Sequence, residues 1–473
     1  MRRSRGILLP PIASRTIHGR DVYRAIRGAI LDGTFSPGDR LPSSRETAKD
    51  YGVSRGMIDE VFAQLADEGF IERGIGKGTF VSASVGRLQA SPKNSVSSHA
   101  ISRRGAWLSS NAACREPEKL RPFNAGVADT RDFPWRIWHR LQSRAARELG
   151  PGALDFADPR GLTDLRAAIA RYLAQFRGIR CTADEVIIFN SAQQALYAIA
   201  LLLLEPRDPV LLETPVYLGA RAAFELAGAK SIPIAVDDDG MRVDRIRRGR
   251  MAYVTPSHQY PTGAMLSLDR RVALLDWAVR NDAWILEDDY DGEFRYEGQP
   301  LTPVYSLDRN ARVLYVGTLS KAMFVSLRIA YAVVPRDLIE PLANIRTQLD
   351  GFTPALSQMT MTLFMEEGHF ASHLRRMRGV YAAKHRMLVD GLAPLAKRGW
   401  TWPDNPAGMH LLIRHASAAK ARAIAQKSGL DLALLSSYRL RHESGDGLLL
   451  RFGGLDEAAI RLGIAKMLTF PRA

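Results

Sequence analysis

The chain has 473 residues, of which 46% are hydrophobic and 24% are charged, and a chain of this length can bury a large core in two or three domains. Its two cysteines, Cys114 and Cys181, exclude a disulfide framework and have no metal-ligand spacing, so we expect a reducing, cytoplasmic location and no bound metal. The longest apolar run, residues 195–204, has about half the length of a membrane-spanning helix, so no membrane attachment is expected.

Positive charge is densest at the N-terminus of the chain. The formal net charge is +15, and residues 1–120 contain 19 Lys and Arg against 12 Asp and Glu. Such an end would attract a polyanion such as DNA, although an arginine-rich genome would produce the same excess.

Residues 20–81 have the pattern of a small helical domain that ends in two strands. Apolar residues at helical spacing, hydroxyl caps and glycine-rich turns define its elements. The predicted elements are helices through residues 22–30, 44–51 and 55–68, and strands over 70–73 and 79–81. This order is typical of a winged helix-turn-helix domain.

The second helix of the helix-turn-helix pair would enter the major groove of double-stranded operator DNA by its N-terminus. Ser54 and Arg55 lie at that end of the helix. Arg45, Lys77 and Gly78 are placed to approach DNA phosphates, because the wing glycines allow close contact with the backbone. The alternative is a helical cap without a role in DNA binding.

The run PGDRLPSSRETAKDYGVSRGMIDEVFAQLADEGFIERGIGKGTFV resembles the GntR-type winged helix, with the similarity extending over residues 23–81. The motifs PSSR, GVSR, L-x-x-EG and GxGTFV occur in the order and spacing of that family. Gly56-Met57 replaces the usual Asn-Thr, which affects how position 56 meets a base.

Composition changes twice beyond the winged helix. Residues 82–120 are rich in Ser, Ala, Arg and Lys and have the character of a basic linker. From about residue 121, strand-like and helical runs alternate, which predicts an α/β fold with a mostly parallel sheet and covering helices. Strand-like runs at 408–414 and 447–452 indicate a smaller C-terminal subdomain. We therefore expect a DNA-binding domain over 1–81, a linker over 82–120 and an effector domain over 121–473.

The segment GTLSKAMFVSLRIAY, residues 317–331, places Lys321 behind a strand-like run. A sheltered lysine can form a Schiff base with a carbonyl group, although many lysines in such turns are solvated surface residues. If Lys321 holds pyridoxal phosphate, the cofactor also needs a carboxylate for its ring nitrogen, donors for its phosphate and an aromatic cover. Candidates occur in chain order in the segments NSAQQA (190–195), ETPVY (213–217), EDDYD (287–291), Thr318 to Arg328, and LRFGG (450–454).

This set of motifs resembles the fold-type-I aminotransferase family, and in particular the MocR group of regulators, which join a GntR-type winged helix to that domain. The similarity extends from about residue 20 to 470 and includes ADPRGLTDLR (157–166) and TPSHQYPTG (255–263). The resemblance implies that pyridoxal 5′-phosphate (PLP) is bound covalently to Lys321. It further implies a carboxylate at the ring nitrogen (Asp288), a phenol at the ring hydroxyl (Tyr290), a stacking ring (Tyr217), phosphate contacts (Ser191, Ala192, Thr318, Ser320, Arg328) and a site for a ligand carboxylate (Arg451).

Several of these assignments have alternatives. Asp288 and Asp289 are adjacent, and the family's Asp-x-Tyr spacing is what favours Asp288. Arg451 could be a structural ion-pair partner, and Tyr217 could belong to the core. His258 is interpreted as a hydrogen-bonded polar residue rather than a general base.

Other positions depart from the family pattern. Ser191 replaces a usual glycine, and Val325, Ser326 and Ala330 replace Pro, Gly and Gly around the phosphate-binding arginine. Tyr260 occupies a position where aminotransferases carry asparagine and where the regulators typically carry an aromatic residue.

We interpret the chain as a PLP-dependent transcriptional regulator. An amino-compound effector would replace Lys321 on the cofactor, forming an external aldimine, and thereby control operator binding. The alternatives are an active aminotransferase with a DNA-binding arm, and a regulator for which PLP alone is the signal. The resemblance also implies a head-to-tail homodimer.

Overall fold

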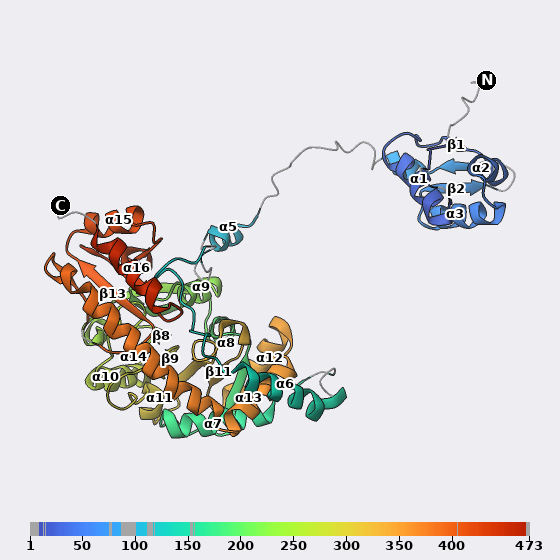
Figure 1. The fold of residues 1–473 in the computed structure, drawn as a ribbon. Helices are drawn as coiled ribbons and strands as arrows, with labels where there is room; N and C mark the ends of the chain where they lie inside the picture. Colours follow the sequence, from blue (N-terminus) through green and yellow to red (C-terminus); the bar gives the residue numbers. More distant parts are fainter. Residues whose placement is uncertain are drawn as a thin grey trace. The chain divides into compact units, whose positions relative to one another are not determined.

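The computed structural model describes residues 9–12, 14, 16–74, 78–86, 101–110, 117, 119–151, 155, 157–403 and 405–469. Its internal contacts divide the chain into two compact units, Met1–Ile101 and Ser102–Ala473 (Figure 1). The boundary between them falls inside the predicted linker, which also contains the short helix α5 (Arg103–Ser110). The exact domain limits remain a prediction.

The first unit is a three-helix domain with a small antiparallel sheet. Its described elements are α1 (Gly19–Leu31), β1 (Arg40–Leu41), α2 (Ser44–Tyr51), α3 (Arg55–Asp67), β2 (Ile71–Gly74), β3 (Gly78–Val81) and the 3₁₀ turn η1 (Ala83–Val85), with strand order β1-β3-β2. Val22, Ile26 and Leu65 are fully buried, because their helical spacing puts them on one face. Gly52 ends α2 with φ of +67°, a left-handed conformation that glycine adopts without strain. The winged helix-turn-helix predicted from the sequence is confirmed.

The second unit contains a large sheet of eight described strands in the order β4-β11-β10-β9-β8-β5-β6-β7. These strands are β4 (Val186–Phe189), β5 (Pro209–Thr214), β6 (Lys230–Asp237), β7 (Gly240–Met241), β8 (Met251–Val254), β9 (Trp284–Asp289), β10 (Val313–Thr318) and β11 (Ala330–Val333). The pairs within β6-β5-β8-β9-β10 are parallel, whereas β11 and β7 are antiparallel to their neighbours. The mostly parallel sheet predicted from the sequence is confirmed.

Helices cover both faces of this sheet. The helices that pack on the sheet or on one another beside it are α6 (Trp135–Leu149), α7 (Thr163–Phe176), α8 (Ala192–Leu203), α9 (Leu218–Leu226), α10 (Leu268–Arg280), α11 (Val304–Leu307), α12 (Arg336–Asp350), α13 (Ala355–Glu366) and α14 (His369–Ala396). Two further helices lie in the C-terminal part of the unit: α15 (Ala418–Lys427) packs on the second sheet, and α16 (Glu457–Leu468) packs against α14. Strand β4 shows the two faces: Ile187 and Phe189 pack with residues of α8, whereas Val186 and Ile188 pack with residues of α7. Strands buried on both sides have continuous apolar sequences, which is why the strand-like runs were visible in the sequence.

A second, antiparallel sheet forms the smaller C-terminal subdomain. Its described strands are β12 (Trp400–Thr401), β13 (His410–His415), β14 (Ala433–Leu434) and β15 (Asp446–Arg451), in the order β12-β13-β15-β14. The remaining 3₁₀ turns of this unit are η3 (Ala183–Glu185), η4 (Val243–Arg245), η5 (Val325–Leu327) and η6 (Leu435–Tyr438).

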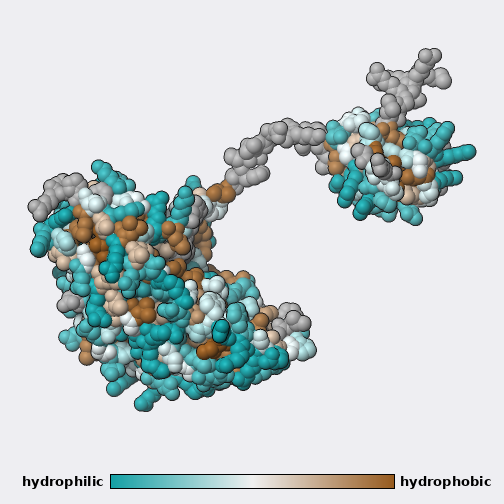
Figure 2. Space-filling view, in the orientation of Figure 1, coloured by the Kyte–Doolittle hydropathy of each residue, from teal (hydrophilic) through white to brown (hydrophobic). Residues whose placement is uncertain are grey.

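Polar residues cover much of the face of each unit seen in Figure 2, with hydrophobic residues scattered between them. The exposed large hydrophobic side chains include Leu268, Leu120 and Ile101. Within the part of the chain that is described, no helix combines the length and the apolar character needed to cross a bilayer.

Candidate functional site

The predicted site residues of the second unit gather at the carboxyl edge of the parallel strands. Strand register places Asp288 beside Val316, so the ends of β9 and β10 lie next to each other. Lys321 follows the end of β10 by three residues, and Tyr217 follows the end of β5 by three. Ligands of open α/β sheets bind at this edge, because loops from several parallel strands converge there.

Lys321 and Arg451 approach a common point beside Gly126. The Lys321 amine donates a hydrogen bond to the Gly126 carbonyl, and Arg451 Nη1 donates to the Asn124 carbonyl at 2.8 Å. A Cβ atom built on Gly126 would lie 3.4 Å from Lys321 Nζ and 3.4 Å from Arg451 Cδ. The sequence segment that begins the large domain therefore brings together an amine and a guanidinium that are 130 positions apart.

The two adjacent aspartates of β9 have different partners. Asp289 is paired with the buried Arg177 and accepts a hydrogen bond from Tyr315 Oη at 2.6 Å. Asp288 Oδ2 accepts from Tyr253 Oη at 2.7 Å, whereas its Oδ1 is buried and has no hydrogen-bond partner among the described residues. Asp289 Oδ1 is likewise buried without a partner among the described residues, so the distinction is one of charge: Asp289 has a cation to compensate it, and Asp288 has an available acceptor atom and no such cation.

Burial raises the pKa of Asp288 to about 7, and the neighbouring carboxylates Asp289 and Asp291 act in the same direction, while the Tyr253 hydrogen bond lowers the pKa. A protonated pyridine nitrogen beside Asp288 would favour the ionised carboxylate. The free acceptor and the raised pKa both fit the role implied for Asp288, although that role remains a prediction.

Four tyrosines and a histidine surround the same region. The rings of Tyr217 and Tyr260 meet edge to face with centroids 5.9 Å apart, and Tyr260 also meets Tyr290, Tyr438 and His410 at 5.2 to 5.7 Å. Aromatic faces and edges of this kind can cover the ring of a flat cofactor. Tyr290 Oη donates to the His258 carbonyl at 2.8 Å.

Arg451 is held by neutral oxygens of three residues. Its Nη2 donates to Tyr438 Oη at 2.6 Å and to Tyr260 Oη at 3.1 Å, in addition to the Nη1 bond with Asn124. These bonds fix the orientation of the guanidinium, whose planar donor set suits a carboxylate. Tyr438, a residue that sequence reasoning missed, belongs to the η6 turn, which also supplies the carbonyl that accepts from Val216 N at 2.9 Å.

The residues proposed for the cofactor phosphate also lie at one edge of the sheet. Thr318 and Phe189 are both in register with Ala330, from opposite sides of β11. The start of α8, with Ser191 at its N-cap and Ala192 as its first residue, follows Phe189. Ser320 and Arg328 flank the turn that leads from β10 to β11, in which Arg328 has φ of +54°. Backbone N–H groups at a helix start, hydroxyls and an arginine form a suitable set for a phosphate.

In the first unit, Ser54 caps helix α3 by accepting a hydrogen bond from Met57 N at 3.3 Å. Arg45, Ser54 and Arg55 are exposed, and Arg55 makes a salt bridge with Asp59 at 3.5 Å. Gly78 begins β3, and Lys77 lies outside the described residues. An exposed, capped helix start is compatible with insertion into a DNA groove, and the contacts themselves remain predictions.

Glu213, at the end of β5, provides a test of the electrostatics beside the site. Burial raises its pKa to about 7, whereas hydrogen bonds from Thr255 and Gln259 lower it. A carboxyl group with a raised folded-state pKa favours folding below its unfolded pKa, and this contribution is lost as the pH rises through about 7. Glu213→Gln should therefore flatten the pH dependence of stability between about pH 4.5 and 7 by about 3 kcal/mol at most.

Denaturant unfolding of the large unit at several pH values would measure this effect. Glu205→Gln, which changes an exposed carboxylate, is the matched control and should follow the wild type. A Glu213→Gln profile that is parallel to the wild-type profile would contradict the prediction.

Sequence reasoning missed several residues that contact the site. Four of them belong to no recognised motif, because each contacts residues that are distant in the sequence: Arg177, Gly126, Asn124 and His410. His410 falls inside the strand-like run 408–414 predicted from the sequence and begins β13.

Comparisons with known proteins agree with the geometry. Residues 107–465 match the model of the aminotransferase class I and II family, and residues 19–81 match that of the bacterial regulatory proteins of the gntR family. The probable rhizopine catabolism regulatory protein MocR of Rhizobium meliloti is 34% identical over 454 residues, which cover 94% of this chain and 92% of MocR. The pyridoxine biosynthesis transcriptional regulator PdxR of Corynebacterium glutamicum is 29% identical, with 93% of each chain covered.

A solved structure is also similar to the large unit. LysN, the α-aminoadipate aminotransferase of Thermus thermophilus, complexed with N-(5′-phosphopyridoxyl)-L-leucine, is 26% identical with a TM-score of 0.71, and the match covers 78% of this chain and 96% of LysN. The chain belongs to the MocR-type transcriptional regulators, in which a GntR-family helix-turn-helix domain is fused to an aminotransferase class I and II domain. Regulators with this helix-turn-helix domain bind operator DNA, and the family of the large unit supports PLP as the cofactor.

Proposed function

We propose that the large unit binds PLP on Lys321 together with an amino compound that carries a carboxylate or a similar anion, and that this occupancy controls operator binding by the small unit. The observation that carries the proposal is the meeting of the Lys321 amine and Arg451 beside Gly126. Arg451 would receive the anionic end of the compound, and its amino end would then lie near Lys321.

The residues present fit PLP, as the free buried oxygen of Asp288 indicates. Asp288 would hold the ring nitrogen, Tyr290 the ring hydroxyl and Tyr217 the ring face. The phosphate would be held by the set Ser191, Ala192, Thr318, Ser320 and Arg328. When bound, the cofactor supplies an aldehyde that reacts with primary amines and a ring that withdraws electrons. LysN, whose structure was solved with a phosphopyridoxyl amino acid, supports a compound of this class.

Regulation requires that the compound bind two arrangements of the protein with different affinity, since equal affinity shifts no equilibrium. A coupling of 1–3 kcal/mol, typical of allosteric proteins, corresponds to about a 5- to 150-fold change in DNA affinity. The head-to-tail homodimer implied by the resemblance remains a prediction, which the molar mass of the protein in solution tests.

The proposal is tested by measuring affinity for a DNA fragment that the full-length protein selects from a random-sequence pool. The titration is made with PLP alone, and then with pairs of compounds in which each amino acid is matched by its decarboxylated amine. We expect an amino acid to change DNA affinity about 5-fold or more and its amine to have no effect, and Arg451→Gln to remove the difference.

Other results would identify the competing functions. A change in DNA affinity with PLP alone would make the cofactor the signal. Repeated conversion of an amino acid to its keto acid, with unchanged DNA affinity, would identify a working aminotransferase and contradict the proposed regulation.

A further inference from the structure

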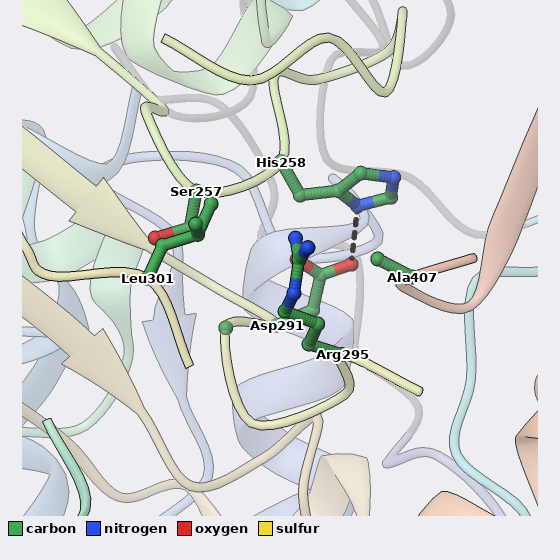
Figure 3. Close-up of a pocket in the computed structure, with 7 residues that line it drawn as sticks. Ser257, His258, Asp291, Arg295, Leu301 and Ala407 are labelled. Carbon is green, nitrogen blue, oxygen red and sulfur yellow. Dashed lines mark hydrogen bonds and ion pairs between the residues drawn. The ribbon is translucent and has the colours of Figure 1, made fainter. Parts of the chain in front are cut away.

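Three buried side chains with nitrogen and oxygen ligand atoms gather next to the candidate site. His258 comes from the loop after β8, Asp291 from the loop after β9, and His410 begins β13. Their exposed fractions are 5%, 2% and 6%. Figure 3 shows His258 and Asp291 facing each other at a pocket that is also lined by Arg295 and Ser257.

The ligand atoms of these side chains lie close enough that a small side-chain adjustment would bring them onto one ion. His258 Nδ1 lies 3.0 Å from Asp291 Oδ2, and one ligand atom of each of the three residues lies within 4.8 Å of the others. The two imidazole rings have centroids 4.7 Å apart. Gly408 makes room for the cluster, because a Cβ at that position would lie 2.4 Å from His258 Nδ1 and 2.8 Å from Asp291 Oδ2.

His410 provides a second and independent observation. Its Nε2 atom is buried and has no hydrogen-bond partner among the described residues. The ring interacts with the backbone of Pro261, which lacks an N–H and can only accept, so the other ring nitrogen is the donor. Nε2 of the neutral ring then carries a lone pair without a partner, and leaving a buried acceptor unsatisfied is destabilising. A bound cation would satisfy it.

We propose that His258, Asp291 and His410 form a binding site for a divalent transition-metal cation of the Zn²⁺ type. Two imidazoles and one carboxylate are a donor set that such ions prefer, and the fourth position would be open to water. Metal–ligand bonds of about 2.0–2.2 Å allow two ligand atoms to lie at most about 4 Å apart. The His258–Asp291 pair already satisfies this limit, and His410 completes the site by a side-chain movement of about 1 Å.

Arg295 supplies a charge that opposes the ion. It lines the pocket beside His258 and Asp291, and its Nη1 contacts Met265 Sδ at 3.0 Å. Removing this charge should strengthen cation binding, because repulsion between like charges is strong where water is excluded. Arg295→Gln is therefore expected to bind the cation more tightly than the wild type.

The test is equilibrium dialysis of the full-length, tag-free protein against Zn²⁺ after removal of metals with a chelator, with zinc measured by elemental analysis. We expect one tightly held zinc per chain, at least about a 10-fold loss of affinity in His410→Asn and Asp291→Asn, and a gain in Arg295→Gln. His442→Gln, which changes an exposed histidine outside the cluster, is the matched control and should bind as the wild type does.

Two results would overturn the site: a wild-type chain without zinc above the buffer level, or a His410→Asn variant with wild-type affinity. Near-ultraviolet circular dichroism reports whether each variant is folded. The gain in Arg295→Gln cannot arise from misfolding, so its absence in a folded variant also counts against the site. These outcomes do not depend on any effect of amino compounds on DNA binding.

Discussion

Lys321→Ala is expected to abolish covalent attachment of PLP completely. Lys321 is the amine that lies beside Arg451 at the carboxyl edge of the sheet, and alanine offers no nitrogen to the cofactor aldehyde. The effect is all-or-none, in contrast to the graded losses expected for residues that only orient the cofactor. Mass spectrometry after borohydride reduction measures it, since the reduced linkage adds the mass of the phosphopyridoxyl group to the wild-type chain.

The control for this experiment is Lys420→Ala, which removes an exposed lysine on helix α15. It should retain the full mass increase. A Lys321→Ala chain that still carries the label at one defined site would show that another lysine holds the cofactor. Equal DNA affinity of the two variants without PLP would show that the folded state is intact.

Arg177→Met is expected to destabilise the large unit by about 3–5 kcal/mol, because it leaves Asp289 buried without its cation. The Arg177 and Asp289 side chains are only 2% and 3% exposed. Arg177 also donates to the Gly292 carbonyl and to Ser257 Oγ, both at 3.1 Å. Methionine keeps much of the side-chain volume, so the loss would report the charge and its hydrogen bonds rather than a cavity.

A second substitution separates these causes. Asp289→Asn in the Arg177→Met background removes the uncompensated charge, and we expect it to recover a substantial part of the lost stability. Arg180→Met, which changes an exposed arginine three residues away, should have little effect. Unfolding in urea measures all four proteins. If Arg177→Met were as stable as Arg180→Met, the buried pair would be dispensable for folding.

Much of the fold could be predicted because the sequence signals are local. Strands buried on both faces, such as β4 and β10, are continuous apolar runs, and the helices between them have regular apolar spacing. The winged helix was predictable for the same reason. Ser43 and Ser54 each cap a helix by accepting a hydrogen bond from the backbone N–H three residues further along the chain. Element ends were less certain, as β3 begins at Gly78, one residue before the predicted start of that strand.

The candidate site was only partly predictable. Motifs after strands identified Lys321 and the Asp288–Asp289 pair, because chemistry at the carboxyl edge follows strand ends. The sequence left the choice between the two aspartates to family spacing. The structure adds a physical distinction, since Asp289 faces Arg177, which is 112 positions away in the chain and has no motif of its own.

The metal-ligand cluster illustrates the same limit. His258, Asp291 and His410 are separated by 33 and 119 positions, so no short sequence motif contains them. The expectation of no metal rested on cysteine and histidine spacing, which describes sites built from one local segment. A site assembled from two loops and the start of a strand is visible only when the chain is folded.

The segment Phe123–Gly126 has a consequence for how tightly any ligand can bind. Its carbonyls at Asn124 and Gly126 accept hydrogen bonds from Arg451 and Lys321, which are the groups that the cofactor and effector would engage. The chain therefore carries an internal competitor, present at a fixed effective concentration set by its own covalent connection. The free energy of these hydrogen bonds must be overcome when a ligand binds, and it therefore weakens the binding free energy of the ligand. Substitutions in the segment should therefore change the ligand concentration to which the protein responds, without altering a ligand-binding side chain.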